Sequence, residues 1–152
     1  MAAPRLEQWR NGFDAQPLNR ALGIRADEIG EGFVQLRVVR VPGSTGGIDG
    51  VTDDDAARVS TFAISTAADL AVVSATGTTI NRLGETMNGT AELNLTYVAL
   101  PQGEAIVRGT VLHRAPTFAV VELRVTDDGG APVAYGRGTY VVRPPAAQQA
   151  AP

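Results

Sequence analysis

The stretch from Val51 to Gly77 constrains the fold more than any other part of the chain, because it is long, rich in small apolar side chains and almost uncharged. From Val59 to Ala75 its one charged side chain is Asp69. A helix with so little charge is expected to be buried on most faces, so the stretch predicts a central helix that other elements cover. Its lone acid needs a hydrogen-bonding partner or a function, since burying an ionised carboxylate is costly.

Local signals mark the ends of this helix. Thr52 is a candidate N-cap, and residues 53–55 are all Asp, which the helix dipole favours in a first turn. Gly77 is expected to end the helix as the residue after its cap. A helix over residues 53–76 would be about 36 Å long, which is unusual in a small domain. A break near residues 58–60 is therefore the alternative.

The segments around the helix have strand and turn patterns. Apolar residues alternate with polar ones at Leu93, Leu95 and Tyr97, as in a sheet that buries one face, and the DDGG sequence at 127–130 is typical of a hairpin turn. The expected elements are a helix over 5–15, a helical turn over 18–22, a hairpin within 24–41 that turns at 30–32, a loop over 42–50, the central helix, a polar stretch over 78–89, and strands over 90–98, 104–114, 118–126 and 133–142. This order predicts an α+β fold in which one long central helix is wrapped by a curved antiparallel sheet.

The chain is long enough for one domain. Its 152 residues, 44% of them hydrophobic, allow one real core and not two. We expect an N-terminal helical segment over 1–16, the main domain over 17–143 and a disordered low-complexity tail over 144–152. An open sheet edge is commonly paired with a second subunit, so a homodimer or a dimer of dimers is expected.

Composition excludes several classes of protein. A net charge of −3 argues against nucleic-acid partners and anionic membranes. With no Cys and one His, the chain lacks material for disulfides, a metal site or a Ser-His-Asp triad. It also has no signal-peptide pattern and no apolar run of the roughly 18 residues that a membrane span needs. We therefore expect a cytoplasmic protein without a cofactor.

Three patterns occur together between residues 17 and 143. They are Asp69 within its apolar helix, the strand TAELNLTYVALP at 90–101, and the segment 111–142, in which His113 and Arg114 precede a turn. In this combination and element order the chain resembles the hotdog-fold acyl-CoA thioesterases of the phenylacetate-degradation type. The resemblance implies a hotdog fold and hydrolysis of an acyl thioester to a free acid and coenzyme A.

The resemblance also implies roles for single residues. Asp69 matches the family's catalytic acid, which acts as general base or nucleophile, and Thr90 matches a hydroxyl residue that holds the attacking water. Ser60, Thr61 and Phe62 stand where the family commonly has His-Gly-Gly, nine to seven residues before the acid. The backbone N–H of Thr61 would polarise the thioester carbonyl only if the helix is broken there, because an intact helix has already used it.

Candidate contacts to coenzyme A come from two segments. His113 and Arg114 match the place where the family meets the coenzyme A phosphates, and guanidinium suits phosphate because it binds in a bidentate manner. Asn81, Arg82 and Asn88, in the polar stretch after the helix, are further candidates.

Structural alternatives stand beside these roles. Asp69 can be a core acid satisfied by Ser65 or by backbone across a dimer, and Thr90 can be present for its strand propensity. His113 and Arg114 can be a strand-end His and a solvated Arg. For the whole protein, the alternative is a non-catalytic hotdog protein that binds acyl-CoA or a lipid-like ligand, which the missing His-Gly-Gly favours.

Overall fold

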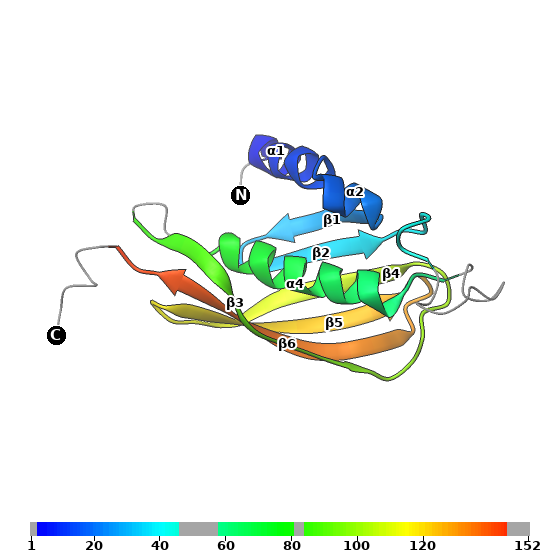
Figure 1. Ribbon diagram of the computed structural model, residues 1–152. Helices are drawn as coiled ribbons and strands as arrows, with labels where there is room; N and C mark the ends of the chain where they lie inside the picture. The colour runs from blue at the N-terminus through cyan, green and yellow to red at the C-terminus, as the bar shows by residue number, and fades with distance from the viewer. Residues whose placement is uncertain (1–2, 46–57, 81–83, 146–152) are drawn as a thin grey trace.

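The structure is a computed structural model that describes residues 3–45, 58–80 and 84–145. A six-stranded antiparallel sheet lies against one long helix, so the predicted α+β architecture is confirmed (Figure 1). The elements are α1 (Ala3–Asp14), α2 (Pro17–Ala21), β1 (Ile24–Gly30), β2 (Phe33–Val38), α4 (Thr61–Gly77), β3 (Thr86–Tyr97), β4 (Ala105–Arg114), β5 (Phe118–Asp127) and β6 (Pro132–Arg143).

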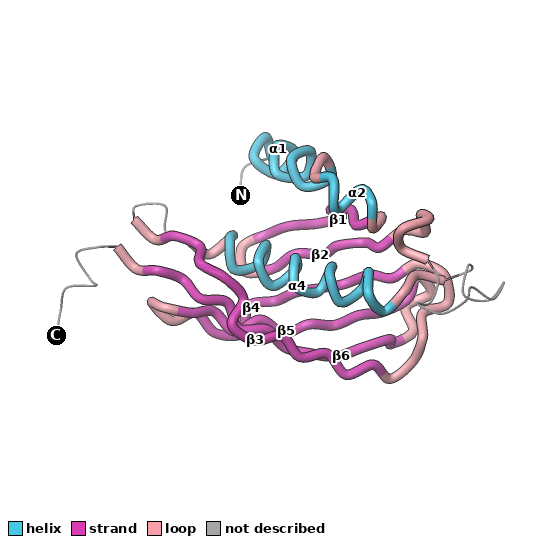
Figure 2. The backbone as a smooth tube through the Cα atoms, in the orientation of Figure 1, coloured by secondary structure: helices cyan, strands magenta, loops and turns pink. Residues whose placement is uncertain are grey.

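The strands lie in the order β1-β2-β4-β5-β6-β3, and α4 crosses one face of the sheet (Figure 2). Both predicted hairpin turns are present, between β1 and β2 and between β5 and β6. Gly32 and Gly130 in these turns have φ of +75° and +87°, a backbone conformation that glycine adopts without steric cost.

The central helix begins later than the acidic cluster suggested. Ser60 is its N-cap, because its Oγ accepts a hydrogen bond from the N–H of Ala63 at 3.2 Å. Val59, just before the cap, forms a bridge with Thr45 and is not helical. The break near residues 58–60 is thus confirmed and one uninterrupted helix from residue 53 is wrong, while residues 46–57, with Thr52, lie outside the described part.

The end of the helix also differs from expectation. Gly77 is its last residue and not a residue beyond the cap, because the chain stays in the right-handed region at Thr78, which is the C-cap. Thr78 Oγ1 donates to the carbonyl of Ala75 and accepts from the N–H of Gly32, so it ties the helix to the β1–β2 turn. The next strand begins at Thr86, where it pairs with the end of β6.

Small residues set the contact between α4 and the sheet. Ala63, Ala67 and Ala71 are fully buried, as their spacing of four predicts for one face of a helix. Gly109 and Gly138 lie under this face, where a Cβ on Gly109 would be 3.1 Å from the carbonyl oxygen of Ala71. The helix backbone therefore lies closer to the sheet than larger side chains would allow.

The two edges of the sheet differ in their protection. At the β1 edge, Asp14 at the end of α1 accepts a hydrogen bond from the N–H of Ala26 at 2.8 Å, and Arg10 donates to the carbonyl of Asp27. At the other edge, β3 pairs with β6 on one side, and residues 91–94 are exposed. Within the described part, β3 is thus the edge available to a further strand.

Replacing Gly138 with alanine tests the close contact between helix and sheet. The new Cβ would lie 2.4 Å from Cγ2 of Val72, so Gly138→Ala should lower the free energy of unfolding by about 1–3 kcal/mol. Urea denaturation measures the change. Gly89→Ala is the matched control, because a Cβ there meets nothing within 4 Å. Equal stabilities for the two variants would contradict the close approach.

Candidate active site

Two of the predicted catalytic residues meet between α4 and β3. Thr90 Oγ1 donates a hydrogen bond to Asp69 Oδ1 at 2.7 Å. The two residues are 21 positions apart, so only the fold brings them together. Among the described residues, no other donor reaches the Asp69 carboxylate. One of its oxygens is therefore held by a hydroxyl, and the other is available to a ligand or to water.

The side of α4 that carries Asp69 is only partly buried. The fully buried side chains of α4 face the sheet. Asp69 lies on a different side of the helix, together with Phe62, Thr66 and Val73, which are spaced from it by three, four or seven residues. Phe62 is 64% exposed. The sheet covers one side of the helix and leaves the side that carries Asp69 partly open within a single chain.

Ser65 does not satisfy Asp69. Its Oγ lies 2.8 Å from the hydroxyl of Tyr97, and Tyr97 donates to the carbonyl oxygen of Thr61 at 2.9 Å. A phenol has one hydrogen, so Ser65 must be the donor to Tyr97. The alternative in which Ser65 is the structural partner of Asp69 is therefore wrong, and Thr90 takes that place.

Ser60 and Thr61 lie at the N-terminal end of α4. The Ser60 side chain caps the helix by accepting a hydrogen bond from the N–H of Ala63. The Ser60 carbonyl accepts a hydrogen bond from the N–H of Ile64 at 3.1 Å. The first N–H groups of a helix have no acceptor within it, so those of Thr61 and Phe62 point out of this end. The condition stated for Thr61, a break in the helix at this point, is met.

The strand register aligns Thr90 with Arg114 across four strands. Thr90 pairs with Tyr140, Tyr140 with Ala119, and Ala119 with Arg114. Three strand spacings correspond to about 14 Å. The predicted coenzyme A residues of β4 thus lie at the same end of the sheet as Thr90.

Arg114 forms an ion pair with Glu85. Its Nη2 lies 2.7 Å from Oε2 of Glu85, and the two side chains are 20% and 15% exposed. Arg114 also donates to the carbonyl of Ala115. The alternative of a solvated arginine is therefore wrong. A phosphate contact by Arg114 would have to use the remaining donors of a guanidinium that is already held in place.

Two of the other predicted coenzyme A residues, His113 and Asn88, are described by the structure, and neither forms an ion pair there. His113 is exposed, with its ring centroid 5.8 Å from that of Phe118. Asn88 is exposed and lies within β3, because this strand begins at Thr86 and not at the expected residue 90. Asn81 and Arg82 lie outside the described residues.

Two tyrosines that were not predicted as site residues, Tyr140 and Tyr97, lie on the two strands β6 and β3 at this side of the sheet. Tyr140 lies beside Thr90 in the sheet and is 6% exposed; burial raises its pKa, and the charge of Asp69 raises it further. Burial also raises the pKa of Tyr97, although the hydrogen bond with Ser65 opposes this effect. Both phenols therefore stay protonated at neutral pH. The alternating pattern included Tyr97, but only the strand register reveals Tyr140.

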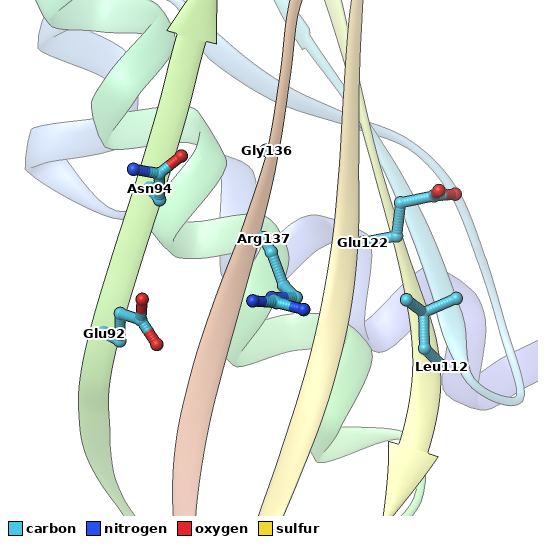
Figure 3. A pocket seen from close by; sticks show the side chains of 6 residues that line it. All are labelled: Glu92, Asn94, Leu112, Glu122, Gly136 and Arg137. Atoms are coloured by element: carbon cyan, nitrogen blue, oxygen red, sulfur yellow. The ribbon is translucent and has the colours of Figure 1, made fainter.

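A concave region lies on the face of the sheet opposite to α4. It is a hollow of about 490 Å³, lined by Glu92, Asn94, Leu112, Glu122, Gly136 and Arg137, with α4 behind the strands (Figure 3). Its lining is mainly charged and polar, which does not suit an acyl group. The candidate catalytic pair lies on the helix side of the sheet and is not part of this hollow.

Two further classes of site are absent from the part of the chain that the structure describes. No group of three or more His, Asp or Glu residues there could hold a metal ion. No helix among these residues is long and apolar enough to cross a membrane.

Comparison with known proteins gives matches of structure and none of sequence. No protein-family profile and no curated protein matches the chain. A mutant thioesterase from Pseudomonas aeruginosa superposes with a TM-score of 0.76 at 17% identity, covering 94% of this chain and 96% of that chain. A thioesterase from Haemophilus influenzae superposes with a TM-score of 0.75 at 13% identity, covering 90% of this chain and 89% of that chain. A Bacillus halodurans protein crystallised with CoA superposes with a TM-score of 0.68 at 24% identity, covering 84% of this chain and 79% of that chain.

These matches confirm the hotdog fold. The structures that the chain resembles include thioesterases, and one of them contains CoA. At these identities the likeness establishes the fold alone, so the activity has to be argued from the residues of the site.

Removing Arg114 should destabilise the protein. Arg114→Ala takes away the guanidinium that neutralises Glu85 in a largely buried setting, and we expect a loss of about 1–3 kcal/mol in the free energy of unfolding. Thermal or urea unfolding measures it. Arg124→Ala is the control, because its ion pair with Glu122 is exposed and should contribute little. A variant as stable as the control would show that the Arg114–Glu85 pair does not hold this end of the sheet.

Proposed function

We propose that this protein is an acyl-CoA thioesterase in which Asp69 acts as general base or nucleophile. The observation that carries the proposal is the 2.7 Å hydrogen bond from Thr90 to Asp69, on a partly open side of α4. The contact holds one carboxylate oxygen and leaves the other for chemistry. The thioesterases of the same fold, and the CoA in one matching structure, support the class of substrate.

The Thr90–Asp69 pair suits activation of water. The Thr90 hydroxyl gives its hydrogen to Asp69, so its oxygen can accept one from water and hold that water beside the carboxylate. Asp69 then takes a proton as the water oxygen bonds to the thioester carbon. When the C–S bond breaks, the sulfur of coenzyme A leaves with the electron pair and receives the proton from Asp69. If Asp69 instead attacks directly, the C–S bond breaks as the mixed anhydride forms and coenzyme A leaves as a thiolate. Water then hydrolyses the anhydride to the free acid and regenerates Asp69, and a proton of that water neutralises the thiolate.

The Thr61 N–H lies too far from Asp69 of its own chain to stabilise an oxyanion formed there. Thr61 and Asp69 are eight residues apart on one helix, a rise of about 12 Å. A reacting carbon must lie about 3 Å from the attacking oxygen, with its oxygen equally close to the donors. We therefore propose a shared site in which Asp69 and Thr90 act with the N–H of the partner's Thr61. Ser60 contributes as the cap that ends the helix there.

A homodimer follows from the same arrangement. The β1 edge is covered by α1, whereas the β3 edge is open. Exposed apolar side chains lie on and after β3 and at the start of α4, namely Phe62, Leu93, Val98 and Leu100. We propose that a second copy covers them by pairing along β3, in a dimer or a dimer of dimers.

Coenzyme A phosphates are proposed to bind at the end of the sheet where Thr90 and Arg114 share a row. Exposed His113 and Asn88 can reach a ligand directly, whereas Arg114 is held by Glu85. Asn81 and Arg82, in the polar stretch after the central helix, remain candidates for contact with coenzyme A.

The acid is tested by Asp69→Asn, which keeps shape and removes charge. Loss of a positioned acid–base group should lower kcat on the best acyl-CoA by about 10² to 10⁴-fold while the protein stays folded. Thiol release from a panel of acyl-CoAs measures the rates. Asn11→Asp, which adds a carboxylate at an exposed position of α1 away from β3, controls for charge and should leave kcat unchanged.

An Asp69→Asn variant that works at the wild-type rate would overturn the mechanism. A wild type that binds acyl-CoAs and releases thiol from none of them would favour the non-catalytic ligand-binding alternative.

The shared site predicts recovery of activity when two inactive variants are mixed. Thr61→Pro removes the N–H at the first helical position, where proline is tolerated, and Thr61→Ala keeps it as control. After mixing and subunit exchange, Asp69→Asn and Thr61→Pro should regain about one quarter of wild-type activity, since heterodimers hold one intact site. No recovery, or a mass of a single 15.8 kDa chain in sedimentation, would contradict the shared site.

A further inference from the structure

Two separate contacts hold β3 against α4. One is the Thr90–Asp69 hydrogen bond, and the other is the chain from Ser65 through Tyr97 to the carbonyl of Thr61. Ser65 lies one helical turn before Asp69, and Tyr97 lies seven residues after Thr90 on the same side of β3. The helix thus contacts the strand at two points through neutral hydroxyl groups.

Within one chain, the sheet constrains β3 from one side only, through its ladder with β6. Its ladder with β6 has register shifts between Met87 and Gly89 and between Thr90 and Glu92. Bulges bend a strand and change its twist, so the Thr90 side chain sits where the backbone geometry is least regular. The threonine side chain is short, and a displacement of about 1 Å would stretch a 2.7 Å hydrogen bond beyond its useful range.

The tyrosine provides a contact that does not depend on the irregular segment. Its hydroxyl accepts from Ser65 and donates to Thr61, so it binds two successive turns of α4 at once. The ring is partly buried and packs against the core. Tyr97 therefore fixes the regular end of β3 on the first turns of the helix.

We infer that Ser65 and Tyr97 are positioning residues for the reaction, because their hydrogen bonds set β3 on α4 so that the Thr90 hydroxyl meets Asp69. The inference rests on the proposed function for its catalytic meaning. Neither side chain touches the Asp69 carboxylate; both act through the placement of Thr90, and Tyr97 also holds the carbonyl of Thr61.

Steady-state kinetics test this role. Tyr97→Phe and Ser65→Ala should each lower kcat about tenfold and change KM less, because misplaced groups weaken the transition state most. The double variant should be no slower than the slower single variant, since either change breaks the same chain. Ser65→Thr keeps a hydroxyl and should restore the rate. Tyr135→Phe is the control, because Tyr135 lies in a different row and is 49% exposed.

Amide hydrogen exchange provides a second readout that does not need activity. Tyr97→Phe should accelerate exchange at Ala63 and Ile64 in the first turns of α4, and leave the last turn unchanged. A wild type without thioesterase activity would overturn the proposed function. Faster exchange in Tyr97→Phe would still support the role of Ser65 and Tyr97 in holding β3 against α4. Unchanged exchange, additive losses in the double variant, or an equal loss of kcat in Tyr135→Phe would overturn the inference.

Discussion

The close packing of α4 on the sheet is the constraint on which the rest of the structure depends. Alanines on the helix and glycines on β4 and β6 let the two backbones approach, with Gly109 and Gly138 directly below Ala71 and Val72. Because the helix lies so near, the edge strand β3 comes alongside it, and short side chains can connect the two. The Thr90–Asp69 hydrogen bond is a consequence of this packing, since neither side chain could span a wider gap.

The polar contacts around the proposed site are made largely by hydroxyl groups. Thr90, Tyr97 and Ser65 connect α4 and β3 without bringing a second charge to Asp69. Arg114, which forms an ion pair with Glu85, lies in the same row of the sheet three strands away from Thr90. Thr90 therefore holds the carboxylate in place, and no second charge within the described part competes with water or substrate for it. This arrangement suits a group that must both take and return a proton.

The two edges of the sheet explain why one chain is only part of the proposed site. α1 closes the β1 edge with a side-chain acceptor for a strand N–H, so growth of the sheet is possible at β3 alone within the described part. The helix geometry separates the Thr61 N–H from Asp69 by far more than a carbonyl group can span. The proposed assembly through β3 and the proposed completion of the site by a second copy thus rest on one topology.

The sequence alone determined the α+β architecture, the two hairpin turns and the lone acid on a small-residue helix, because these follow from local periodicity, glycine and proline chemistry and the cost of a buried charge. It also identified Asp69 and Thr90 as separate candidates. It misplaced the start of α4, since an acidic cluster and Ser60 are both acceptable local signals and only tertiary packing chooses between them. Strand register decided which residues became the partners of Asp69, Ser65 and Arg114, namely Thr90, Tyr97 and Glu85. Register is a long-range property that no local pattern contains.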